Sequence, residues 1–171
     1  MYFMFHILHI CIHHLLPQLR EDALFLLGLY GDHPGLYRDT ARGNKPVLYV
    51  YDSYRTPPEQ WRELLADPRR PPWVYLGLLV EEKHLAEIEF AGWDGFYTYF
   101  SVDGFTFGST RANWPRIADF AARKRLSFVP CLGPGYIDTA IRPWNHANTR
   151  PRDEGAYFRD VFRALQQIQA S

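Results

Sequence analysis

The chain of 171 residues has no excess of charge, because 19 lysine and arginine residues balance 19 aspartate and glutamate residues. No basic stripe interrupts this balance, which argues against a nucleic-acid partner, since phosphates select a basic surface. The chain also lacks an acidic tail, an internal repeat and low-complexity segments, so neither a disordered chain nor a repeat protein is expected. These absences leave one globular domain with a sizeable core.

Cysteine is scarce, and no hydrophobic run reaches transmembrane length. Cys11 and Cys131 both lie in apolar runs and are expected to be buried free thiols. Residues 1–16 are apolar but contain four histidines, which makes the segment too short and too polar for a membrane span, and it lacks the features of a signal peptide. His9 and His13, spaced i, i+4, would share a metal ion on a helix. No carboxylate accompanies them and Cys11 would lie on another face, so we expect no metal and no other cofactor.

A glycine-rich turn is missing after the first strand-like run, which argues against a dinucleotide-binding sheet. What the chain has is an alternation of strand-like and helix-like segments, typical of an α/β fold with parallel strands and outer helices. Of the two architectures with this rhythm, the barrel is preferred to the doubly wound sheet. The strands are expected at 47–51, 73–80, 96–100 and 126–132, and the helices at 19–29, 58–65, 85–90, 113–124 and 153–169.

Polar side chains follow the ends of the expected strands. Right-handed crossovers would bring these strand ends to one rim, where α/β barrels bind ligands. The segment 133–145 follows the fourth strand and starts with Gly133-Pro134-Gly135, which lets the backbone turn sharply. It then offers a carboxylate, a guanidinium, an amide and two aromatic rings within ten residues. Two interpretations stay open: a ligand-binding loop, or a structural loop whose polar groups satisfy its own backbone.

Several blocks of sequence resemble glycoside hydrolase family 99, the glycoprotein endo-α-1,2-mannosidases. They are YVYDSY at 49–54, LLVEEKH at 78–84, DGFYTYF at 94–100 and GPGYIDT at 133–139, extended by RPWN at 142–145 and NTR at 148–150. The blocks occur in the family's order with similar spacing, and together they cover roughly residues 30–152.

The resemblance implies a (β/α)8 TIM-type barrel that cleaves inside glucosylated mannose branches of N-glycans with retention of configuration. In eukaryotes it implies a Golgi membrane protein with a lumenal domain. One carboxylate of such enzymes deprotonates the sugar's own 2-hydroxyl, and a second protonates the leaving group. The implied partner is a mannose-containing oligosaccharide, with no obligate protein partner. Residues implied as substrate contacts are Asp52, Tyr54, Glu81, Glu82, His84, Tyr97, Tyr99, Tyr136, Asp138, Arg142, Trp144 and Asn145.

The sequence departs from the family in two places. Where members read FHIEPY, this chain reads FHILHI at 5–10, so residues 1–30 are expected to form a divergent lead-in and helix before a partial barrel at 31–171. The family's FNEWHEG stretch, with both catalytic glutamates, does not occur before Ser171, so we expect the last barrel units to be missing. Adjacent Glu81 and Glu82 would point to opposite faces of a strand and cannot replace that pair. No catalytic residue is assigned, and the chain alone is expected to be an inactive fragment. The alternatives are a non-catalytic glycan-binding remnant and a fragment without function.

Overall fold

The computed structural model describes residues 5–7, 15–100 and 102–169. They divide into two compact units, Met1–Leu78 with Lys83–Phe96 and Leu79–Glu82 with Tyr97–Ser171. The histidine pair and Cys11 lie outside the described residues, so the expectation about a metal at that place is not tested.

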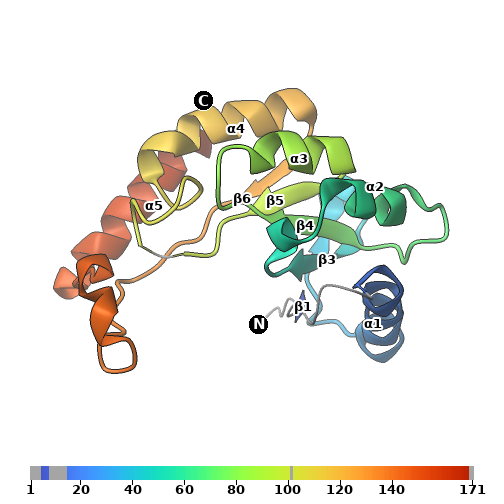
Figure 1. Ribbon diagram of the computed structural model, residues 1–171, viewed down its shortest axis with the longest axis horizontal. Helices are drawn as coiled ribbons and strands as arrows, with labels where there is room; N and C mark the ends of the chain where they lie inside the picture. Colours follow the sequence, from blue (N-terminus) through green and yellow to red (C-terminus); the bar gives the residue numbers. More distant parts are fainter. Residues whose placement is uncertain (1–4, 8–14, 101, 170–171) are drawn as a thin grey trace. The chain divides into compact units, whose positions relative to one another are not determined.

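The first unit is built on a mostly parallel sheet (Figure 1). Strand β3 (Lys45–Val50) lies between β1 (Phe5–Ile7) and β4 (Val74–Leu78) and is parallel to both, with Val47 opposite Val74. The start of β5 (Gly95–Tyr97) follows β4 in the strand order. All five residues of β4 are buried, as expected for a parallel strand that is covered on both faces. The expected parallel pairing of the first two strands is therefore confirmed.

A short antiparallel strand, β2 (Arg38–Asp39), also pairs with β3. It leads into β3 through Gly43 and Asn44, both with positive φ.

Three helices accompany this sheet, α1 (Leu15–Tyr30), α2 (Pro58–Ala66) and α3 (His84–Ala91). Proline in the first turn favours the start of α2, since its missing N–H has no partner there in any helix. α3 ends where Gly92 takes the left-handed conformation with φ 78°, which glycine adopts without a steric cost. α2 and α3 pack together (Figure 1). The ring of Trp61 in α2 lies 4.6 Å from the ring of Trp93, which follows α3.

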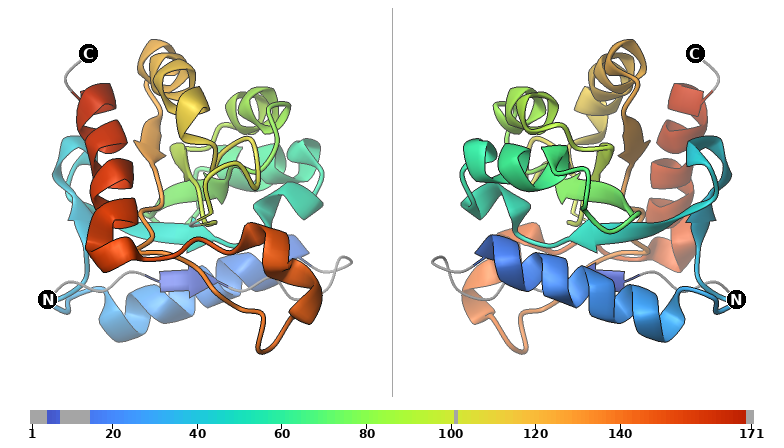
Figure 2. Two further views of the ribbon diagram at one scale, coloured as in Figure 1. Left: turned by 90° about the vertical axis from the view of Figure 1, so that its left-hand side faces the viewer. Right: turned by 90° about the vertical axis from the view of Figure 1, so that its right-hand side faces the viewer.

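The second unit contains β6 (Ser127–Val129), α4 (Trp114–Lys124) and α5 (Ala156–Gln169). The two helices lie side by side in Figures 1 and 2. Within this unit, the backbone N–H of Thr98 donates to the Val129 carbonyl oxygen at 3.1 Å, which joins β6 to the segment just past Tyr97. α4 buries Trp114, Ile117 and Ala121 on one face, as an amphipathic helix does.

The sequence and the structure differ in strand number and length. β1 was not expected, because histidine interrupts the apolar pattern in its segment. β5 and β6 are shorter than the expected 96–100 and 126–132, since a side chain replaces the backbone ladder beyond them: the Cys131 N–H donates to Thr98 Oγ1 at 2.7 Å. Within the described part of the chain, no helix combines the length and the hydropathy that a membrane crossing requires.

Candidate functional site

The turn after β3 is fixed by backbone and side-chain hydrogen bonds within the first unit. Asp52 takes a left-handed conformation, φ 53°, which aspartate tolerates better than most residues, and its carboxylate pairs with Arg55 Nε at 2.9 Å. Buried Ser53 links the turn to the end of β4, because its Oγ accepts from the Leu78 N–H at 2.7 Å. Its carbonyl oxygen accepts from Trp61 Nε1 of α2 at 2.8 Å. The Asp52 carboxylate is therefore mostly buried, and its charge is already paired.

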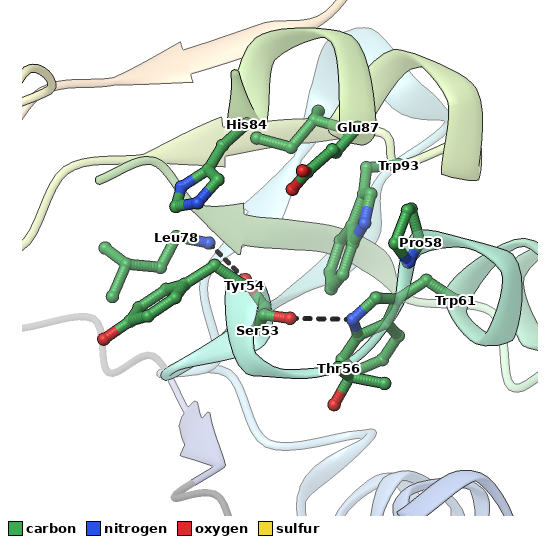
Figure 3. A pocket seen from close by; sticks show the side chains of 10 residues that line it. Ser53, Tyr54, Thr56, Pro58, Trp61, Leu78, His84, Glu87 and Trp93 are labelled. Atoms are coloured by element: carbon green, nitrogen blue, oxygen red, sulfur yellow. Dashed lines mark hydrogen bonds between the residues drawn. The ribbon is translucent and has the colours of Figure 1, made fainter. Parts of the chain in front are cut away.

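Tyr54 and His84 are brought together beside a small pocket (Figure 3). Their rings stack with centroids 5.2 Å apart and planes 15° from parallel. His84 is the first residue of α3 and is only 3% exposed. The pocket of about 20 Å³ is lined also by Glu87 and Trp93, and a volume of that size holds about one water molecule. His84 is thus a packed core residue, and the pocket is too small for a sugar ring.

The two adjacent glutamates after β4 are both exposed. In the second unit, Arg116 of α4 donates a hydrogen bond to the Glu82 carboxylate. This bond lowers the pKa of Glu82, so the carboxylate is ionised at neutral pH. An ionised Glu82 that is paired with Arg116 has no proton to give to a leaving group.

The two tyrosines of the third expected strand differ in exposure. Tyr97 ends β5 and is 3% exposed, whereas Tyr99 lies beyond the strand and is 46% exposed. Tyr99 meets Phe100 edge-on at 5.6 Å, and Phe100 meets Phe105 at 5.0 Å. Of the two tyrosines, Tyr99 offers the accessible aromatic ring.

A hub formed by the Asp138 carboxylate organises the loop after β6. Tyr136 donates its hydroxyl to Oδ2 at 2.7 Å, and Asn145 Nδ2 lies 2.9 and 3.0 Å from the two carboxylate oxygens. Arg142 Nη1 adds a third donor at 3.1 Å. Burial alone would raise the pKa of Asp138, but the hydrogen bonds from these three residues lower it below its ordinary value. The same contact raises the pKa of Tyr136.

The backbone closes this loop at its base. Tyr136 and Arg150 exchange two backbone hydrogen bonds, both 2.8 Å long. Gly135 precedes them with φ 139°, and a Cβ atom there would lie 2.9 Å from the Arg150 carbonyl oxygen. Only glycine fits this combination of a positive φ and a close backbone approach.

The loop turns its apolar side chains outward. Ile137, Ile141 and Trp144 are 68%, 78% and 80% exposed. The polar residues expected to contact substrate are engaged mainly with one another around Asp138, whereas the Trp144 indole is free to stack on a flat apolar surface such as a sugar face. Both interpretations of the loop therefore have support: it satisfies its own polar groups, and it displays an aromatic ring.

A second set of contacts, which the sequence did not reveal, anchors the loop within the unit. Arg150 Nη2 donates to the Asp103 carbonyl oxygen at 2.8 Å, and Arg111 Nη2 lies 2.9 Å from Asp103 Oδ2. The Asp103 N–H donates to the Tyr157 hydroxyl at 3.0 Å. The Asp103-Gly104 pair is a turn signal. Its contacts with Arg150 and Tyr157, which are 47 and 54 residues away, cannot be recognised from a single sequence.

Each unit thus gathers part of the expected site. Tyr54 and His84 meet in the first, and Tyr136, Asp138, Arg142 and Asn145 meet in the second. The expected gathering of the strand ends on one rim draws on both units and stays a prediction. Among the described residues, no three of histidine, cysteine, aspartate and glutamate are grouped so as to hold a metal ion.

Comparison with known proteins finds one family along nearly the whole chain. The sequence profile of glycosyl hydrolase family 99 matches residues 3–171. The glycoprotein endo-alpha-1,2-mannosidase of Rattus norvegicus is 42% identical over 163 residues, which are 90% of this chain and 35% of that protein. The glycoprotein endo-alpha-1,2-mannosidase-like protein of Danio rerio is 42% identical over 160 residues, 88% of this chain and 36% of that protein. The chain thus spans about a third of the length of these curated relatives.

A solved structure is similar throughout the fold. The GH99 endo-alpha-mannosidase from Bacteroides thetaiotaomicron aligns with a TM-score of 0.88 at 40% identity, over 97% of this chain and 53% of that one. The expected fold class, an α/β partial barrel, is therefore confirmed, with this chain corresponding to about half of the larger protein.

Proposed function

Because the chain belongs to glycosyl hydrolase family 99, we propose that it carries glycan-recognition elements of an endo-α-1,2-mannosidase and binds mannose-containing branches of N-glycans. The observation that supports this most is the loop after β6. Its polar residues hold one another around Asp138 while Trp144 is 80% exposed. A rigid loop with an outward aromatic ring suits a sugar, which needs a flat apolar face for stacking.

The reaction proposed for full-length proteins of this kind is hydrolysis within glucosylated mannose branches with retention of configuration. Such chemistry needs one carboxyl group that is protonated and a second that is ionised. Three carboxylates among the expected substrate contacts are already engaged: Asp52 pairs with Arg55, Glu82 with Arg116, and Asp138 accepts from three donors. We therefore propose that this chain alone binds glycan without cleaving it.

Binding is tested by titrating the purified chain with a glucosylated high-mannose glycan in a calorimeter. Trp144→Ala should weaken binding about five- to tenfold, as loss of one aromatic stacking contact predicts. Ile141→Ala is the matched control, because Ile141 is 78% exposed on the same loop and lacks an aromatic ring. Equal affinity of wild type and Trp144→Ala, or equal losses in both variants, would contradict a stacking role.

In a eukaryotic source we propose the Golgi membrane as the location, with the barrel in the lumen. The proposal is supported by the family resemblance. Co-staining of the full-length product with a Golgi marker tests it, and a purely cytosolic distribution would contradict it.

A further inference from the structure

The Asp138 hub lies entirely within residues 136–145, so it fixes the shape of the loop after β6 without attaching the loop to the rest of its unit. The attachment starts at the base of the loop, where Tyr136 and Arg150 exchange two backbone hydrogen bonds. An aromatic ring stacks on a sugar only in a particular orientation. The position of the loop, and not only its shape, therefore decides whether the Trp144 ring can bind.

Arg150 ties the loop to another segment through its guanidinium group. One arm, Nη1, donates to the Thr149 carbonyl oxygen at 3.0 Å and to the Ala147 carbonyl oxygen at 3.3 Å, both within the loop. The other arm, Nη2, donates to the Asp103 carbonyl oxygen at 2.8 Å. Because a guanidinium is planar and rigid, its two arms hold the partners on either side at a fixed separation.

Asp103 is a firm anchor for this contact, because other parts of the second unit hold it in turn. Its N–H donates to the hydroxyl of Tyr157 in α5 at 3.0 Å. Its Oδ1 accepts from the Arg111 N–H at 2.9 Å, and its Oδ2 lies 2.9 Å from Arg111 Nη2. The Arg111 guanidinium also lies 5.7 Å from the centre of the Tyr157 ring, within the range of a cation–π contact. The carbonyl group that receives Arg150 therefore belongs to a residue whose backbone and side chain are both fixed.

We propose that Arg150 is a positioning residue for glycan recognition, which holds the loop after β6 and its Trp144 ring in the position that binds sugar. The inference rests on the glycan binding proposed for this loop and adds the residue that orients it. Three protein carbonyl oxygens accept from the Arg150 guanidinium, as suits a group that joins two segments. Apparent affinity scales with the fraction of molecules in the binding-competent arrangement, so a loop that occupies it a tenth to a third of the time binds about three- to tenfold more weakly.

A double-mutant cycle, measured by calorimetry with a glucosylated high-mannose glycan, tests this role. Arg150→Met should weaken binding about three- to tenfold. In the Trp144→Ala background the same substitution should change affinity less than about twofold, because the ring that Arg150 orients is gone. Additive losses would show that Arg150 acts on the glycan by itself and would overturn the proposal. The matched control is Arg163→Met, which should not change affinity, since Arg163 is an exposed arginine paired with Asp160 on α5.

A distance measurement tests the position of the loop without glycan. Spin labels are attached at Ile141→Cys in the loop and Arg123→Cys on α4, both exposed positions, in a chain whose two native cysteines are replaced by serine. Arg150→Met should broaden the distribution of distances between the labels, and Arg163→Met should leave it narrow. Such broadening in a chain that binds no glycan would refute the proposed function and still assign Arg150 the positioning of the loop. An unchanged distribution would overturn the positioning role, whatever the affinities.

Arg150→Lys keeps the outcome decisive if Arg150→Met does not fold. Lysine keeps the positive charge, but its ammonium group is a single point charge without the rigid two-armed shape of a guanidinium. Arg150→Lys should therefore also weaken glycan binding and broaden the distance distribution. Wild-type affinity together with a narrow distribution in this variant would show that the two-armed contact does not position the loop.

Discussion

At the scale of single residues, Asp138 has the most consequential role. One carboxylate accepts hydrogen bonds from Tyr136, Asn145 and Arg142, and these bonds join the two ends of a ten-residue stretch. Charge-assisted hydrogen bonds of this kind are stronger than neutral ones. The side chains that the family resemblance implies as substrate contacts therefore also determine the conformation of the loop.

The lowered pKa of Asp138 predicts how the stability of the loop depends on pH. A carboxyl group whose pKa is lower in the folded state adds stability above its unfolded pKa, which is about 3.9 for aspartate. That contribution disappears as the pH falls through the lowered folded pKa. Asp138→Asn should therefore lower the Tm at pH 7, and the gap to wild type should narrow progressively below about pH 4.

Thermal melts of both proteins from pH 7 to pH 2.5 check this prediction. Tyr136→Phe is the matched comparison, because it removes one donor and keeps the carboxylate; it should show a smaller loss at neutral pH. A gap between wild type and Asp138→Asn that stays constant with pH would mean that the charge of the hub contributes nothing.

At the scale of elements, glycines determine which segments approach closely. Gly108 lies in the loop before α4, and a Cβ atom there would be 2.4 Å from the Leu79 carbonyl oxygen and 3.1 Å from Thr98 Cγ2. Its own N–H donates to the Val80 carbonyl oxygen at 3.3 Å. By contrast, Gly28 lies inside α1 with no atom within 4 Å of its hypothetical Cβ.

These two glycines predict opposite effects of the same substitution. Gly108→Ala should destabilise the protein by about 1–3 kcal/mol, because a backbone oxygen cannot move aside as a flexible side chain can. Gly28→Ala should stabilise it by about 0.5–1 kcal/mol, since alanine is the better helix former. Urea unfolding of both variants measures the effects. A tolerated Gly108→Ala would show that the loop does not approach Leu79 this closely.

Elements were predicted well from the sequence where a local pattern specifies them. The helices expected at 85–90 and 113–124 were found as α3 and α4 with small errors in their bounds. β1 was missed, because three residues with a central histidine give no periodic signal, and its existence depends on pairing with β3 across some forty residues. The candidate site was likewise predictable only where its residues are close in sequence. The residues of the Asp138 hub were recognised because they are close in sequence, whereas the contacts of Asp103 with Tyr157 and Arg150 required the folded chain.

At the scale of the whole molecule, the prediction about catalysis rests on how the carboxylates of the candidate site are paired. None of Asp52, Glu82 and Asp138 is arranged as a proton donor facing an ionised partner. Purified chain incubated with a glucosylated high-mannose glycan should therefore release no glucose–mannose disaccharide above a buffer control. Loss of acid–base assistance alone typically lowers the rate about 10²–10⁴-fold. Release that Glu82→Gln abolishes would contradict this and would assign Glu82 a catalytic role.

The inverted arrangement of the loop after β6, with polar groups inside and apolar groups outside, has a consequence for sequence variation. Asp138 with its three donors, Gly135 and the contacts of Arg150 hold the conformation of the loop. The outward side chains at positions 137, 141 and 144 are therefore not needed for folding. Substitutions there can accumulate without loss of stability and can change what the loop touches. Among related proteins, differences in ligand preference should therefore concentrate at these three positions, while the hub beneath them stays the same.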